Sequence, residues 1–125
     1  MSANQSNACG GASNLIFPCS GGSDVGALSD LAARQMTRDG SGKMYCLAGV
    51  GAQIPGILST TRGASKILAV DGCPMDCARK ILERAGFSQF VHLRLSDAGF
   101  QKGASPSTPD NVSKVAAAGC AALAG

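Results

Sequence analysis

The cysteines are the residues of this chain whose type and spacing suggest chemistry. Two of them lie close together in AVDGCPMDCARKILERAGF, residues 69–87, where an apolar run gives way to a helical pattern. Cys73 and Cys77 are four positions apart. Paired thiolates at a helix start bind metal ions or attack electrophiles, whereas a free cysteine also packs as a small apolar residue. The segment therefore allows a metal site, a reactive dithiol or helix packing.

Composition indicates the compartment and the partners of the protein. The first residues, MSANQSNACGGASN, lack the basic start and apolar core of a secretory signal, and no apolar run approaches the length of a membrane span. We therefore expect a cytoplasmic protein without a membrane partner, whose cysteines are more often reduced, metal-bound or catalytic than paired in disulfides. The net charge of +3 is spread over scattered Lys and Arg residues, which argues against a nucleic-acid partner.

Four short apolar runs alternate with segments of helical length, and this order predicts the fold. The runs are LIF at 15–17, MYCLAGV at 44–50, KILAV at 66–70 and FVHLRL at 90–95. Strands alternating with helices imply right-handed parallel crossovers. We predict a three-layer α/β sandwich with about four parallel strands and flanking helices, of flavodoxin-like or Rossmann-like type. In the last run His92 and Arg94 alternate with apolar residues, which predicts an edge strand with one wet face and no metal role for His92.

The intervening segments carry helix signals. Gly40 ends the first helix, Cys73 followed by Pro74 starts the third, and Thr108 caps the last. The predicted helices cover about residues 24–38, 54–65, 73–86 and 108–123.

The length of 125 residues suits one domain. We divide the chain into a flexible amino-terminal tail, 1–13, and a single α/β domain, 14–125. Cys9 lies in the tail, either as an additional thiol that folds over the site or as a spectator. Cys120 lies on the apolar stripe of the last helix, where we expect it in the core.

The predicted topology brings four cysteines to one edge of the sheet. Cys19 follows the first strand, Cys46 lies in or just after the second, and Cys73 follows the third. The carboxyl ends of parallel strands form a common binding crevice. Cys77 is one helical turn beyond Cys73, a spacing that lets both sulfurs bind one zinc ion.

Other residues near this edge have less distinct roles. Asp71 either orients a cysteine and accepts N–H bonds or closes a turn, and Asp97 and Lys102 either rim the site or are solvated loop residues. The loop CSGGSDVG would stabilise a thiolate or an anion. It lacks the lysine of a P-loop, and Gly26 stands where a Cys-based phosphatase needs an arginine, so nucleotide binding is not our first choice.

The segments CSGGSDVG, CLAGVG and DGCPMDCA, in this order and at these separations, resemble the DGC-domain family, whose members are described as zinc-binding proteins. The resemblance runs from about Leu15 to Lys102. It implies that Cys19, Cys46, Cys73 and Cys77 are zinc ligands, and it says little about a reaction or a physiological role.

Three hypotheses follow. The first is a zinc site that is structural or serves metal handling, where four thiolates leave no position for water activation. The second is a redox or group-transfer enzyme in which Cys73 is the thiolate and Cys77 the resolving thiol. The third is an iron–sulfur cluster on the same cysteines. A homodimer in which Cys9 completes the site of a second subunit is compatible with each.

Overall fold

Four parallel strands form the centre of the domain, as predicted. The computed structural model describes residues 13–125. The strands are β1 (Leu15–Pro18), β2 (Lys43–Met44), β3 (Ile67–Asp71) and β4 (Val91–Arg94). Their order in the sheet is β2-β1-β3-β4 and every neighbouring pair is parallel. This is the strand order of flavodoxin-like folds, and β4 lies at an edge as its sequence pattern indicated.

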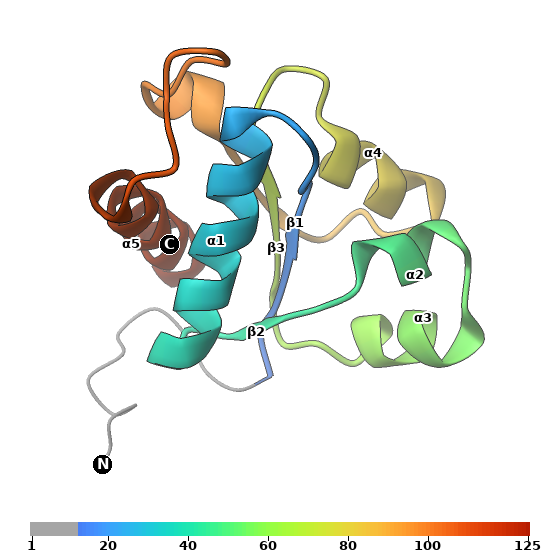
Figure 1. The fold of residues 1–125 in the computed structure, drawn as a ribbon. Helices are drawn as coiled ribbons and strands as arrows, with labels where there is room; N and C mark the ends of the chain where they lie inside the picture. The colour runs from blue at the N-terminus through green and yellow to red at the C-terminus, as the bar shows by residue number, and fades with distance from the viewer. Residues whose placement is uncertain (1–12) are drawn as a thin grey trace.

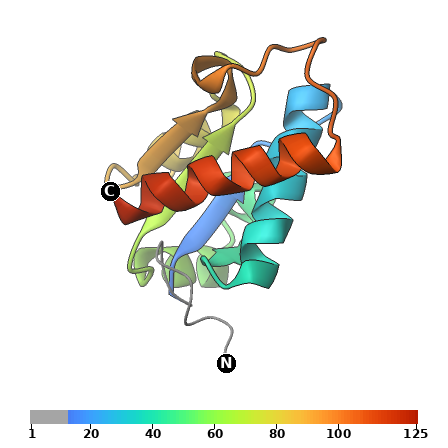
Figure 2. The same ribbon diagram turned by 90° about the vertical axis from the view of Figure 1, so that its left-hand side faces the viewer.

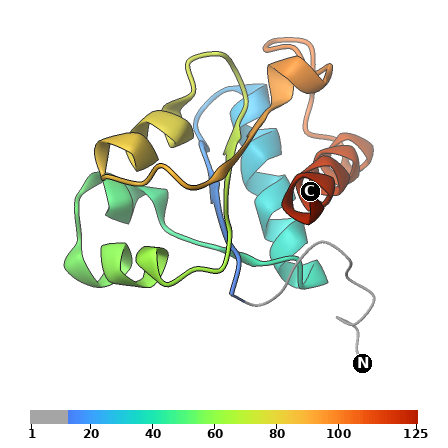
Figure 3. The ribbon, with the colours of Figure 1, turned by 180° about the vertical axis from the view of Figure 1, so that it is seen from behind.

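Helices cover both faces of the sheet, which gives the predicted three layers (Figure 1). The helices are α1 (Asp24–Asp39), α2 (Leu47–Gly51), α3 (Pro55–Arg62), α4 (Cys77–Arg84) and α5 (Pro109–Ala124), with a short 3₁₀ turn, η2, at Leu95–Ala98. Helices α1 and α5 lie on one face, and α5 crosses the strands there (Figure 2). Helices α2, α3 and α4 lie on the other face (Figure 3). No helix within residues 13–125 is long and apolar enough to cross a membrane.

Side-chain alternation along the strands divides the core in two. Ile16 and Leu68 point toward α1 and α5, where they join Leu28 and Leu123 in one apolar cluster. Phe17 points toward the opposite face, which α2, α3 and α4 cover. There it belongs to a second cluster with Val50, Ala69, Ala78 and Leu82. Because both faces are covered, the central strands are apolar throughout.

The long helices begin and end where their sequence signals predict. Ser23 caps α1 by accepting the N–H of Gly26 at 3.0 Å, and Gly40 ends the helix with φ 86°. Thr108 caps α5 by accepting the N–H of Asn111 at 3.2 Å. These local signals work because the capping atoms belong to the same few residues as the groups they satisfy.

The predicted strand at 44–50 is wrong beyond its first residue. Strand β2 ends at Met44, and residues 47–51 form the helix α2. The Cys46 sulfur caps this helix by accepting the Gly49 N–H at 3.3 Å. A Cβ added at Gly49 would lie 2.1 Å from the Ile57 side chain of α3, so α2 and α3 pack closely at this glycine. An apolar run of this length does not by itself distinguish a strand from a buried helix.

The predicted start of the third helix at Cys73 is also wrong. Helix α4 begins at Cys77, after a turn that includes Pro74. Asp76 has a left-handed backbone with φ 54°, which interrupts helical geometry directly before Cys77. Cys73 and Cys77 therefore flank a turn and are not successive positions on one helix face.

Candidate functional site

The carboxyl edge of the sheet holds the cysteines that the sequence singled out. Cys19 directly follows β1, Cys46 follows β2 by two residues, and Cys73 follows β3 by two residues. These three strands are neighbours in the sheet. The chain leaves β1 toward one face and β3 toward the other, and in such folds the crevice between the diverging loops is the usual binding position.

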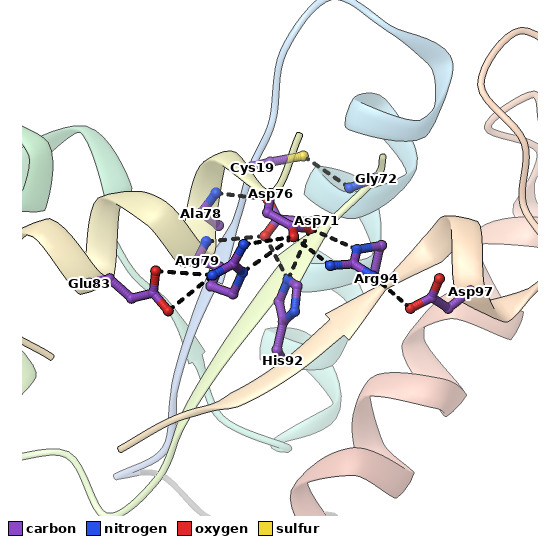
Figure 4. Close-up of polar contacts among 10 residues, drawn as sticks. All are labelled: Cys19, Asp71, Gly72, Asp76, Ala78, Arg79, Glu83, His92, Arg94 and Asp97. Carbon is purple, nitrogen blue, oxygen red and sulfur yellow. Dashed lines mark hydrogen bonds and ion pairs between the residues drawn. The ribbon is translucent and has the colours of Figure 1, made fainter. Parts of the chain in front are cut away.

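Cys19 is the thiol most closely tied to the β3–α4 turn. Its backbone N–H donates to the Val70 carbonyl at 2.8 Å, and its sulfur accepts the Gly72 N–H at 3.4 Å (Figure 4). Burial raises the pKa of the Cys19 thiol, and the nearby charges of Asp71 and Cys77 act in the same direction, against hydrogen bonds from Gly72 and Ser29 that lower it. A cation at this position would replace the thiol proton.

Gly72 allows the turn to lie close to Cys19. A Cβ at position 72 would lie 2.8 Å from the backbone carbonyl group of Val25 in the first turn of α1. Only a residue without a side chain fits this approach unless the backbone moves. The glycine between Asp71 and Cys73 therefore brings the third cysteine segment against the segment that follows the first strand.

The remaining thiols differ in exposure. Cys73 is half-buried, whereas Cys46 and Cys77 are exposed, and all three are unpaired, as is Cys19. The structure brings the Cys19 sulfur into contact with Gly72, the residue before Cys73. Within residues 13–125, however, no three sulfurs lie as close together as 4.8 Å. Cys9 lies outside the described residues.

Asp71 links the end of β3 to the start of α4. Its side chain is 1% exposed, and it accepts the N–H groups of Ala78 at 2.7 Å and Arg79 at 3.1 Å. A carboxylate at a helix amino terminus satisfies free N–H groups and complements the helix dipole. Asp71 therefore caps α4 from the preceding strand, which is the N–H-accepting role considered for it.

Asp76 ties the same turn to β4. Its carboxylate is 2% exposed and accepts Arg94 Nε at 2.8 Å and Arg79 Nη2 at 3.0 Å (Figure 4). Hydrogen bonds from Arg94 first, and from Arg79, hold the pKa of Asp76 well below its usual range, against the opposing effect of burial. The charge of His92 also favours the ionised form. This network of charged side chains therefore fixes the turn that carries Cys73 and Cys77 against β4.

His92 and Arg94 are the functional-site residues that sequence reasoning missed. The sequence pattern predicts a wet face for both, whereas each is partly buried on the face that carries Asp71, because β3 and β4 pair Ala69 with His92 and Asp71 with Arg94. His92 Nε2 lies 2.8 Å from Asp71 Oδ2. The signal was the alternation of polar residues on a strand beside one that ends in aspartate, which is informative only once the strand order is known.

Asp97 and Lys102 are the two residues expected at the rim of the site, and Asp97 contacts this network. Asp97 pairs with Arg94 Nη1 at 3.0 Å, so it forms the outer end of the network. Lys102 is exposed on the following loop. The network is therefore continuous from the turn after β3 to the turn after β4.

Asp71, Asp76 and His92 are the described residues that could hold a metal ion as a group, since their ligand atoms lie within 4.8 Å of one another. The two carboxylates already accept backbone N–H groups and two guanidinium groups. Positive charges of Arg79 and Arg94 beside the carboxylates oppose a further cation there. This geometry fits a network that positions the cysteine turn better than it fits a primary metal site.

Comparison with known proteins gives the family. No solved structure matches this chain. The chain is similar to the anaerobic and virulence modulator AnvM of Pseudomonas aeruginosa, with 38% identity over 88 residues that cover 70% of this chain and 67% of that protein. The family model of the DGC domain matches residues 15–118, which include every strand, the network and four of the cysteines. This chain therefore belongs to the DGC domain family.

Proposed function

We propose that this protein binds one zinc ion through cysteine thiolates at the carboxyl edge of its sheet, as a structural or metal-handling site. The proposed ligands are Cys19, Cys46, Cys73 and Cys77, with Cys9 as an additional candidate. The observation that carries the proposal is the contact of the Cys19 sulfur with the Gly72 N–H, which joins the first cysteine segment to the third.

The donor set suits zinc chemically. Four unpaired cysteines follow three neighbouring strands, and thiolates are the ligands that structural zinc sites prefer. Exposure of Cys46 and Cys77 leaves both side chains able to change rotamer toward an ion. Backbone N–H groups already directed at the sulfurs of Cys19 and Cys46 would stabilise the thiolate forms.

Elemental analysis tests this proposal. Protein purified anaerobically without chelator is expected to contain about one zinc per chain. Single Cys→Ser variants at positions 19, 46, 73 and 77 are each expected to lower that content. Ser113→Ala is the control, because Ser113 is exposed on α5, which covers the face of the sheet away from α4, whereas Cys120 is disulfide-bonded and its replacement would release a thiol. Zinc-free wild-type protein of normal stability would refute the proposal.

A second set of variants locates the metal. If the ion instead binds at Asp71, Asp76 and His92, His92→Ala removes it while the four serine variants retain it. If the cysteines bind it, His92→Ala retains zinc near the wild-type content. Both results are read from the same metal analysis, with circular dichroism to verify folding.

The thiol-dependent redox hypothesis is the second candidate, and the specific observation for it is that Cys77 is exposed at the first position of α4, separated from the half-buried Cys73 by a short turn. In such a reaction Cys73 and Cys77 would form a disulfide, and a disulfide-containing substrate would leave as two thiols. Absence of metal together with rapid alkylation of Cys73 or Cys77 at neutral pH would favour this function. Absorption in the visible range after anaerobic purification would instead indicate an iron–sulfur cluster.

We further propose that the protein acts in the cytoplasm. The cysteines at positions 19, 46, 73 and 77 are unpaired, which suits a reducing compartment, although Cys120 is disulfide-bonded, contrary to the expectation that the cysteines are reduced. Cell fractionation that recovered the protein outside the cytoplasm would contradict this. Sedimentation with and without zinc tests the homodimer in which Cys9 reaches a second subunit.

A further inference from the structure

A surface pocket beside β2 has no part in the cysteine site proposed above, apart from one shared residue at its rim. It has a volume of about 540 Å³, within the range of about 300–1,000 Å³ that is usual for small-molecule pockets. It is lined by Arg34, Thr37, Arg38, Met44, Tyr45 and Cys46. Among the residues that the structure describes, the lining contains two arginines and no acidic residue.

The two arginines come from one exposed face of α1, where positions four apart lie above one another. Arg34 Nε binds Asp30 Oδ1 at 2.5 Å, so one side of its guanidinium is already engaged. Arg38 makes no ion pair with any other residue in the described part of the chain. The pocket therefore has a net positive charge and one guanidinium available for an oxyanion, the group that its planar fork fits best.

The lining of the pocket joins α1 to the end of β2. Thr37 Oγ1 accepts the Met44 N–H at 2.8 Å and donates to the Ala33 carbonyl at 2.8 Å, which fixes α1 against β2. The Tyr45 ring stands edge-on to the buried Phe17 ring, with centroids 6.1 Å apart. Met44 and Tyr45 line the pocket beside the two arginines, so apolar side chains stand next to the basic ones.

We propose that this pocket binds a small organic oxyanion, a carboxylate or phosphate ester with a compact apolar or aromatic body. Arg38 holds the oxyanion with Arg34 as its neighbour, and Met44 and Tyr45 contact the apolar body. The proposal does not depend on zinc binding, since its contacts use the arginines, Met44 and Tyr45.

Titration of the ¹⁵N-labelled full chain with phenyl phosphate and with benzoate tests it. We expect saturable amide shifts at Thr37, Arg38 and Tyr45 that weaken as salt is raised. Benzyl alcohol, which has the ring without the charge, is expected to bind at least about tenfold more weakly, and inorganic phosphate, which has the charge without the ring, also more weakly.

Variants assign the contacts. Arg38→Gln is expected to weaken phenyl phosphate binding about fivefold, and the double variant with Arg34→Gln more than that. Lys114→Gln, an exposed cation on α5, is the matched control and should leave binding unchanged. Equal binding of benzyl alcohol, unchanged affinity of the double variant, or shifts confined to other regions would overturn the proposal. Inorganic phosphate that binds as tightly as phenyl phosphate would overturn the apolar contact. Zinc content, measured on the same samples, separates failure of this site from failure of the cysteine site.

Discussion

At the residue scale, the charged groups beneath the cysteine turn have the clearest physical consequences. Asp76 is buried in a left-handed conformation and meets two arginines that are each about one-third exposed, with side-chain exposures of 32% for Arg79 and 29% for Arg94. An aspartate tolerates this backbone conformation better than most residues do. The fold therefore keeps the Asp76 carboxylate ionised. The carboxylate also fixes the turn through its bonds to Arg79 and Arg94.

Asp76→Asn tests that network. Asparagine keeps the size and the left-handed tendency but removes the charge, and we expect a loss of about 2 kcal/mol in the free energy of unfolding at pH 7. Asp110→Asn is the control, since Asp110 is 78% exposed in its pair with Lys114 and should contribute at most about 0.5 kcal/mol. Urea unfolding measures both. Equal stability of Asp76→Asn and wild type would contradict this account of the turn.

The pH dependence follows from the lowered pKa of Asp76, set mainly by Arg94. Because the folded-state pKa lies below the unfolded value of about 3.9, the contribution is complete above that pH and is lost as pH falls further toward the folded-state pKa. The difference between wild type and Asp76→Asn should therefore shrink between about pH 4 and pH 2. Urea unfolding across this range checks it, and a difference that stays constant would exclude the carboxylate charge as the cause.

At the scale of elements, the turn between β3 and α4 depends on its fit against α1. Gly72 approaches Val25 so closely that an added Cβ meets backbone at 2.8 Å. Asp71, one residue earlier, caps α4 from the strand. The helix therefore starts at Cys77 because its amino terminus is satisfied from β3.

Gly72→Ala should cost about 1–3 kcal/mol and displace the cysteine turn from Cys19, because the Val25 backbone cannot move aside as a flexible side chain would. Gly56→Ala is the control: nothing lies within 4 Å of an added Cβ there, so helix α3 should gain about 0.5–1 kcal/mol. Thermal unfolding and zinc content together report the effect. A Gly72→Ala protein with normal stability and full metal content would show that the close approach is dispensable.

At the scale of the whole molecule, stability comes from the two apolar clusters on either side of the sheet. Leu28 is fully buried and Leu31, on the same helix, is 40% exposed. Leu28→Ala is expected to lower the free energy of unfolding by about 3 kcal/mol, and Leu31→Ala to change it by no more than about 0.5 kcal/mol. Chemical denaturation measures both, and similar costs would contradict the assigned orientation of α1.

Removal of zinc distinguishes a structural site from one that handles metal. If the ion holds the three strand-end segments together, a chelator should lower the melting temperature, because binding free energy adds to folding free energy. If the ion is cargo, the apo protein should keep most of its stability, since the two apolar clusters are formed by buried side chains that do not bind the ion, even though Cys19 packs against one of them. Calorimetry with and without added zinc separates the two roles.

Much of this molecule is encoded locally and was predictable from the sequence. The helices α1 and α5 begin at Ser23 and Thr108 because their capping atoms lie three residues from the N–H groups they satisfy. The parallel sheet follows from alternating strands and helices, which place Cys19, Cys46 and Cys73 at one edge in any such fold.

What only the tertiary structure decided depends on contacts between distant segments. The helix at 47–51 forms where Gly49 packs on Ile57, and α4 starts late because Asp71 and Asp76 hold the turn before it. His92 joins the network only because β3 and β4 are neighbours in a particular register. A sequence pattern shows which side chains one segment can offer. Hydrogen bonds and ion pairs between segments depend also on where the partner segments lie, and those positions are fixed only when the whole core is packed.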